Sequence, residues 1–65
     1  MKLTRGDIIR KGNTCYRVAG IKALRAGFGA DSHAVDGYML QNKYGVVFGP
    51  HTSEEMDKCG YQKTA

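Results

Sequence analysis

The chain has 65 residues and a formal net charge of +4, from ten Lys and Arg against six Asp and Glu. A chain of this length buries only about 60% of the surface that its unfolded form exposes, so we expect one thin core. Formation of a homodimer, or binding of another partner, would add to the stability of such a core. No apolar run approaches the ~18 residues of a membrane span, and the first residues lack the apolar stretch of a signal peptide. We therefore predict a single cytoplasmic domain with no membrane partner.

The cysteine count argues against a disulfide-stapled fold. Cys15 and Cys59 are too few for the disulfide framework of small secreted domains, so we expect reduced thiols that pack as small hydrophobic groups. The alternative, for an exported protein, is a single disulfide between Cys15 and Cys59. The two cysteines, His33 and His51 together equal in number the four ligands of a tetrahedral zinc site. However, structural zinc sites usually contain two ligands close together in the sequence, and no two of these residues are nearer than eight positions. We predict no metal and no cofactor.

Two short stretches contain residue types that enzymes use, and neither is convincing. Asp31-Ser32-His33 has the residues of a hydrolase triad, but sequence neighbours project in different directions and cannot form the relay. Gly27-Phe28-Gly29 lacks the remaining residues of a nucleotide-binding loop. Because a chain of this size also has little volume for a substrate pocket, we predict that the protein is not an enzyme.

The first half of the chain predicts a β-hairpin. Asp7–Arg10 and Thr14–Ala19 flank Lys11-Gly12-Asn13, and short β-branched or aromatic runs around a Gly-Asn pair are the usual signal for this motif. Alternation in the second strand places Tyr16 and Val18 on one face, and Cys15 and Arg17 on the other.

The strand pattern breaks at Gly20, because Ile21 is out of phase with Val18. This predicts a bulge that turns Ile21 toward the core. The segment 21–26 also fits a short helix that ends at Gly27, and the sequence leaves strand and helix open here. Residues 27–37 have no period and many turn formers, which predicts a long irregular loop, either functional or mobile.

The second half predicts another hairpin and one helix. Tyr38–Gln41 and Val46–Phe48 bracket a turn at 42–45, and Gly49-Pro50 should end the second strand. Thr52-Ser53-Glu54-Glu55 has the form of a capping box, so we expect a helix over 53–59 that stops at Gly60, with Met56 and Cys59 on one face and Tyr61 packing back. The domain is expected to span residues 1–61, with 62–65 as a frayed tail.

These elements predict a mainly β fold: a small SH3-like or OB-like barrel of four to five short strands with one short C-terminal helix. The likeness is one of architecture only, and no family motif accompanies it.

Charge is unevenly distributed along the chain. Residues 1–30 contain seven Lys and Arg against one Asp, whereas residues 31–65 contain three Lys against five Asp and Glu. A basic cluster of this kind suits phosphate contacts, and exposed aromatic residues would add stacking for a single strand. The candidate nucleic-acid residues are Arg5, Arg10, Lys11, Arg17, Lys22, Arg25 and Lys43.

Protein binding is the other hypothesis, and the one that we favour. Phe28 and Tyr44 both lie in expected loops, where a large apolar side chain is hard to explain as core, and aromatic residues are enriched at binding hot spots. An unpaired edge strand would offer a second contact. The sequence thus predicts a small accessory protein that binds another protein through the Phe28 loop, the Tyr44 turn and an edge strand, with nucleic-acid binding by the basic hairpin as the alternative.

Overall fold

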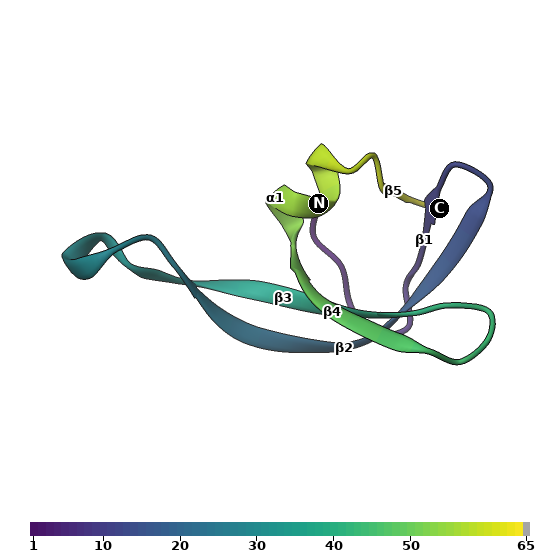
Figure 1. Cartoon of the computed structure of the whole chain (residues 1–65), viewed down its shortest axis with the longest axis horizontal. Helices are drawn as coiled ribbons and strands as arrows, with labels where there is room; N and C mark the ends of the chain where they lie inside the picture. The colour runs from purple at the N-terminus through teal and green to yellow at the C-terminus, as the bar shows by residue number, and fades with distance from the viewer. Residues whose placement is uncertain (65) are drawn as a thin grey trace.

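The computed structural model, which describes residues 1–64, is a five-stranded antiparallel sheet with one short helix. The strands lie in the order β4-β3-β2-β1-β5, and the helix follows β4 on one side of the sheet (Figure 1). The elements are β1 (Ile8–Lys11), β2 (Thr14–Ala26), a 3-10 turn (Gly29–Asp31), β3 (His33–Gln41), β4 (Val47–Thr52), α1 (Ser53–Lys58) and β5 (Gln62–Lys63). The sheet is not closed, since β4 and β5 are its two edges, so the expected barrel is not confirmed.

The first hairpin is confirmed. β1 pairs with β2 from Lys11↔Thr14 to Ile8↔Arg17, and Val18 is fully buried while Arg17 is exposed, as the alternation predicts. A register shift between Val18 and Gly20 confirms the bulge. Ile21 then pairs with Tyr38, in phase with the core, but its side chain is 43% exposed. The prediction that Ile21 reaches the core is wrong, because the bulge sits where the strand is leaving the body of the molecule.

The segment 21–26 is strand, which settles the open choice between strand and helix. β2 continues to Ala26, and β3 begins at His33, so the expected irregular loop over 27–37 is wrong for residues 33–37. The two strands pair in unbroken register from Gly20↔Met39 to Ala26↔His33. Cross-strand hydrogen bonding therefore overrides the helix propensity of this stretch and the turn-forming residues that follow.

The second hairpin is confirmed, but its outer strand is longer than expected. Asn42 organises the turn, since its side-chain Oδ1 accepts hydrogen bonds from the backbone N–H groups of Tyr44 (2.9 Å) and Val46 (3.0 Å). β4 continues through Gly49 and Pro50 to Thr52, with a register shift opposite the step from Tyr38 to Leu40. Pro50 does not end the strand, because an edge strand with a bulge tolerates a residue that lacks an N–H donor.

The helix α1 begins and ends where its capping residues predict. Thr52 Oγ1 accepts a hydrogen bond from the backbone N–H of Glu55 (3.2 Å), which satisfies one of the free donors of the first turn. At the other end, Tyr61 N–H donates to the Met56 carbonyl (3.0 Å) and Gly60 N–H to the Asp57 carbonyl (3.3 Å), the paired bonds of a Schellman cap.

Residues after α1 add a short strand to the sheet. Gln62 and Lys63, expected at the start of the frayed tail, form β5 and pair with β1. Thr64 follows with two hydrogen bonds to the Ile8 carbonyl, one from its backbone N–H (3.1 Å) and one from its hydroxyl (2.9 Å). Ala65, the last residue of the expected tail, lies outside the described residues.

One core lies between the sheet and α1. Its buried side chains come from the N-terminal segment, four places in the sheet and the helix: Leu3, Ile9, Val18, Tyr38, Leu40 and Met56. Tyr16, Phe48 and Tyr61 pack around it half-buried, with Tyr16 edge-on to the other two rings at centroid distances of 5.5 and 5.7 Å. Across residues 1–64, no helix has the length and apolar character needed to cross a membrane.

Candidate binding surfaces

The most prominent feature of the molecule is an arm formed by the far ends of β2 and β3 and the turn between them, residues 22–36. In Figure 1 it extends away from the rest of the sheet and forms one end of the longest axis. The molecule measures 39 × 20 × 17 Å along its principal axes, so the arm accounts for its elongated shape. None of the arm residues is buried.

Phe28 sits in the turn at the end of the arm and is 92% exposed. It lies between Gly27 and Gly29, whose φ angles of +91° and +58° belong to the left-handed region that favours glycine. The Phe28 carbonyl accepts a hydrogen bond from the Asp31 N–H (3.1 Å), and the Gly29 carbonyl accepts one from the Ser32 N–H (3.2 Å). The exposed ring is therefore carried on a hydrogen-bonded turn.

The arm carries no net charge, although it lies at the junction of the basic and acidic halves of the sequence. Its formal charges are those of Lys22, Arg25, Asp31 and Asp36, two of each sign. The basic character of the first half of the chain therefore does not extend along the arm.

The arm also has free strand edges. β1 pairs with β2 only as far as Arg17, and β4 pairs with β3 only from Gly37 onward. Beyond these points β2 and β3 pair with each other alone, so each has one edge without a neighbouring strand. By contrast, β5 at one edge of the sheet has two residues, and β4 at the other is interrupted by a register shift and Pro50.

Tyr44, the second predicted aromatic anchor, is 78% exposed in the turn between β3 and β4. That turn lies at the opposite end of the long axis from the arm turn (Figure 1), so the structure does not bring Tyr44 and Phe28 together. Lys43 Nζ lies 5.1 Å from the Tyr44 ring centroid. A recess of about 560 Å³ beside this turn is lined by the two aromatic rings Tyr16 and Phe48 as well as by Tyr44.

The seven candidate cationic residues are all exposed, but they do not form one face. Cross-strand partners in a sheet project to the same side. Ile9, Val18 and Leu40 point into the core, so the residues that alternate with them point away from it. We call this second side the outer face. By register its polar members are Arg10, Cys15, Arg17, Lys22, His33, Gln41, Thr52 and Gln62, and apolar side chains such as Ile8, Leu24 and Val47 lie on the same side.

The other four candidates lie elsewhere. Lys11 is on the core side of β1, where its Nζ lies 5.3 Å from the Tyr61 ring centroid. Arg25 is on the opposite side of the arm from Lys22, since it pairs with Ala34. Arg5 lies in the turn before β1, and Lys43 lies in the β3–β4 turn. The basic hairpin of the sequence thus contributes only Arg10 and Arg17 to a shared face, joined by Lys22.

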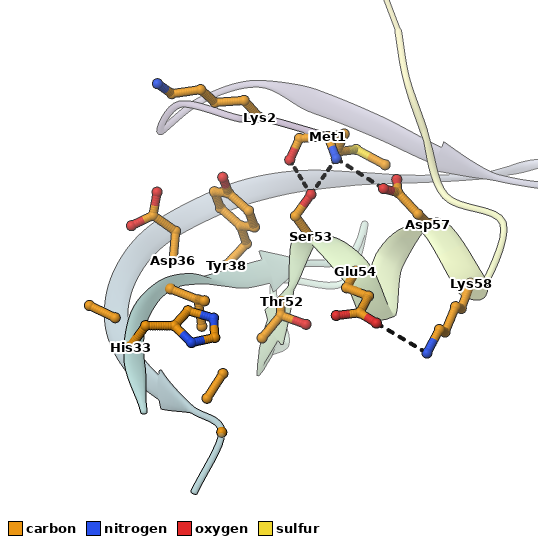
Figure 2. Close-up of a pocket in the computed structure, with 14 residues that line it drawn as sticks. Met1, Lys2, His33, Asp36, Tyr38, Thr52, Ser53, Glu54, Asp57 and Lys58 are labelled. Carbon is orange, nitrogen blue, oxygen red and sulfur yellow. Dashed lines mark hydrogen bonds and ion pairs between the residues drawn. The ribbon is translucent and has the colours of Figure 1, made fainter. Parts of the chain in front are cut away.

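An open groove of about 1050 Å³ separates the root of the arm from α1. Figure 2 shows His33, Asp36 and Tyr38 on the sheet side and Ser53, Glu54 and Asp57 on the helix side. Two of the carboxylates already have cationic partners, because Glu54 pairs with Lys58 (3.3 Å) and Asp57 with the Met1 ammonium group (3.1 Å). Within residues 1–64, no three His, Cys, Asp or Glu side chains gather as a metal site.

The histidines and cysteines singled out in the sequence are all peripheral. His33 starts β3 on the arm, and His51 in β4 lies 3.4 Å from the Glu55 carboxylate. Cys15 and Cys59 are free and exposed, so the expectation that they pack as buried hydrophobic groups is wrong.

Comparison with protein-family models, curated proteins and solved structures finds no match to this chain.

Sequence reasoning missed two features of these surfaces. One is the arm itself, whose β3 half (His33–Asp36) the sequence predicts as loop. Val35 is the single β-branched residue of that stretch, so its local strand signal is weak. The other is the division of the cations between faces, which depends on the bulge at Gly20 and on the register of β2 with β3.

Proposed function

We propose that the protein is a non-enzymatic binding module that inserts Phe28 into an apolar pocket of a protein partner. The observation that carries this proposal is the 92% exposure of a phenylalanine on a hydrogen-bonded turn at the end of the arm. A ring of this size makes no contribution to the core from that position, and burying it against a partner would remove a large apolar area from water.

The geometry of the turn supports this function energetically. Binding is weakened by the entropy lost when a loop becomes ordered, and a turn that is already held by hydrogen bonds loses less. The neutral charge of the arm favours an apolar contact over a phosphate contact. Aromatic residues that fill a partner's pocket are typical hot spots, so Phe28 should dominate the binding free energy.

The free edges of the arm offer a second element of the same interface. A partner strand could add alongside residues 33–36 of β3 or alongside the far end of β2, through main-chain hydrogen bonds of the kind used in strand addition. We place the edge-strand contact of this module on the arm, because β5 is very short and β4 carries Pro50.

The test is affinity capture with three forms of the protein: wild type, Phe28→Ala and Tyr44→Ala. Tyr44→Ala is the matched control, since it removes an exposed aromatic ring from the other end of the molecule. We expect a partner that is retained by wild type and by Tyr44→Ala but lost with Phe28→Ala, at least a tenfold loss of affinity for a hot-spot residue. Circular dichroism should show the same fold for all three. A partner held equally by Phe28→Ala would overturn the proposal.

A further inference from the structure

The outer face of the sheet is open and cationic. α1 and the buried residues of the core lie on the other side, and within residues 1–64 no element covers the outward side chains. A row of cross-strand partners runs over four strands here, from Ile8 through Arg17 and Gln41 to Val47. The exposed fractions of Ile8 (42%) and Val47 (47%) show that the ends of this row are accessible.

We propose that this outer face binds the phosphate backbone of double-stranded nucleic acid through Arg10, Arg17 and Lys22. Arg10 and Arg17 are diagonal neighbours, because Arg10 pairs with Cys15, two positions before Arg17; diagonal positions in a sheet are about 7–8 Å apart. Two exposed cations at neighbouring positions repel each other weakly, and an anion that contacts both offsets that repulsion.

No anion of the protein serves that purpose. None of these three cations takes part in an ion pair within residues 1–64. None of the six acidic residues occupies an outward position of the sheet: three are on α1, Asp36 faces the core side, Asp31 is in the arm turn, and Asp7 precedes β1 and pairs with Lys63. The uneven charge of the sequence therefore becomes a difference between two sides of the sheet, and the cationic side is complementary to a polyanion.

The side chains between the cations favour a duplex over other anionic surfaces. Single-strand binding needs aromatic rings on which bases stack, and the outer face has none, since Tyr16, Phe48 and Tyr61 pack on the core side. Insertion into a membrane surface typically uses several exposed Trp, Phe and Leu side chains. Of these the outer face has only Leu24, which is half-buried and lies over Gly37. Gln62 instead supplies a neutral amide donor of the type that contacts phosphate and sugar in protein–DNA interfaces. Gln41 Nε2 donates one hydrogen to the Gly45 carbonyl (3.3 Å) and has a second amide hydrogen for such a contact.

The first experiment is a fluorescence-anisotropy titration of a labelled duplex of mixed sequence at two salt concentrations a factor of about four apart. Three phosphate contacts on B-form DNA predict that the affinity falls about 40-fold over this range. Removal of one contact by Arg17→Gln or Arg10→Gln should weaken binding at low salt and reduce the salt effect to about 12-fold. Arg25→Gln is the matched control, because it removes the same charge from the other side of β2 and should leave the salt effect unchanged.

A chemical footprint gives an independent readout of the same face. Cys15 lies across from Arg10 on the outer face, whereas Cys59 caps α1 on the core side, and both thiols are exposed. Saturating duplex should slow alkylation of Cys15 severalfold and leave Cys59 unchanged. The second cysteine thus serves as a control within the same molecule.

Four results would overturn the inference: no duplex binding at the lowest salt, equal loss of binding in Arg25→Gln, tighter binding to a single strand than to the duplex, or binding to anionic vesicles without binding to duplex. Phe28→Ala should bind duplex like wild type, so failure of this inference is distinguishable from failure of the function proposed for the arm.

Discussion

A Cβ atom placed on Gly27 would lie 2.8 Å from the carbonyl oxygen of Asp31, closer than real side chains approach backbone. Gly27→Ala must therefore both enter the left-handed region and displace the turn that carries Phe28. We expect a loss of about 1–3 kcal/mol in the stability of this turn, together with weaker partner binding. Hydrogen exchange of the turn amides and affinity capture of the partner would measure the two effects.

Gly29→Ala is the control for this prediction. Gly29 also has a positive φ, of +58°, but nothing lies within 4 Å of the Cβ atom that alanine would add. Its effect should be the smaller of the two, on the order of 1 kcal/mol from backbone conformation alone. Equal effects of the two substitutions would show that the contact with Asp31 has no energetic role.

Met56→Ala should destabilise the whole domain. Met56 is the one fully buried residue of α1, and it joins the helix to Ile9, Val18 and Leu40. Truncation of a buried methionine costs about 2–5 kcal/mol, which is a large part of the stability of a domain with so small a core. Urea denaturation followed by circular dichroism would measure the change.

Met56→Leu tests the same site if Met56→Ala does not fold. Leucine preserves most of the volume, so the loss should stay below about 1.5 kcal/mol. Cys59→Ala, at the exposed end of the same helix, should change the unfolding free energy by no more than about 0.5 kcal/mol. If Cys59→Ala proved as costly as Met56→Ala, the helix would have to pack through a different face.

Asp7 predicts a particular pH dependence of stability. The backbone N–H of Thr4 donates to its carboxylate (2.8 Å) and Lys63 Nζ lies 3.5 Å away, and these interactions, the first the larger, hold the pKa of Asp7 below its usual value. The stabilisation is therefore present above the pKa of the unfolded chain, near 4, and is lost as the pH falls through the lower folded-state pKa.

Asp7→Asn should remove this contribution. The free energy of unfolding of the variant should therefore be lower than that of wild type at neutral pH and approach the wild-type value in acid. Urea midpoints at several pH values would test this. Lys63→Gln keeps the Thr4 hydrogen bond and should retain most of the pH dependence. A constant difference between Asp7→Asn and wild type at all pH values would refute the role assigned to the carboxylate.

Both cysteines should react as free thiols in the folded protein. Cys15 projects from the outer face and Cys59 is exposed at the end of α1, with no disulfide between them. A thiol reagent under native conditions should therefore add to both residues, as counted by mass spectrometry. Labelling at one residue only, or none without denaturant, would contradict these exposures.

Local sequence signals predicted the elements whose structure depends on local contacts. The Gly12-Asn13 turn, the Asn42 turn and the Thr52 capping box each contain the residues that form their own hydrogen bonds. The fold class, a mainly β chain with one short helix, follows from these signals. So does the exposure of Phe28 and Tyr44, since each lies in a turn.

The predictions that proved wrong concern segments whose structure depends on contacts with residues far away in the sequence. The stretch 21–26 has the composition of a helix, and only its register with β3 makes it strand. Pro50 marks the end of a strand in most contexts, but here it lies on an edge, which no local pattern shows. Likewise the faces of Lys22 and Arg25 depend on a bulge whose effect on the alternation requires the partner strand.

The separation of the arm from the core has a consequence for how the molecule opens. All six core residues lie outside residues 22–36, so the arm can unzip while Ile9, Val18 and Leu40 stay packed. Amide protons of the arm should then exchange through local fraying, whereas those of the central strands should exchange only when the whole domain unfolds. A ligand that binds the end of the arm would slow amide exchange there first. The positions of the slowed amides would identify the residues that the ligand contacts.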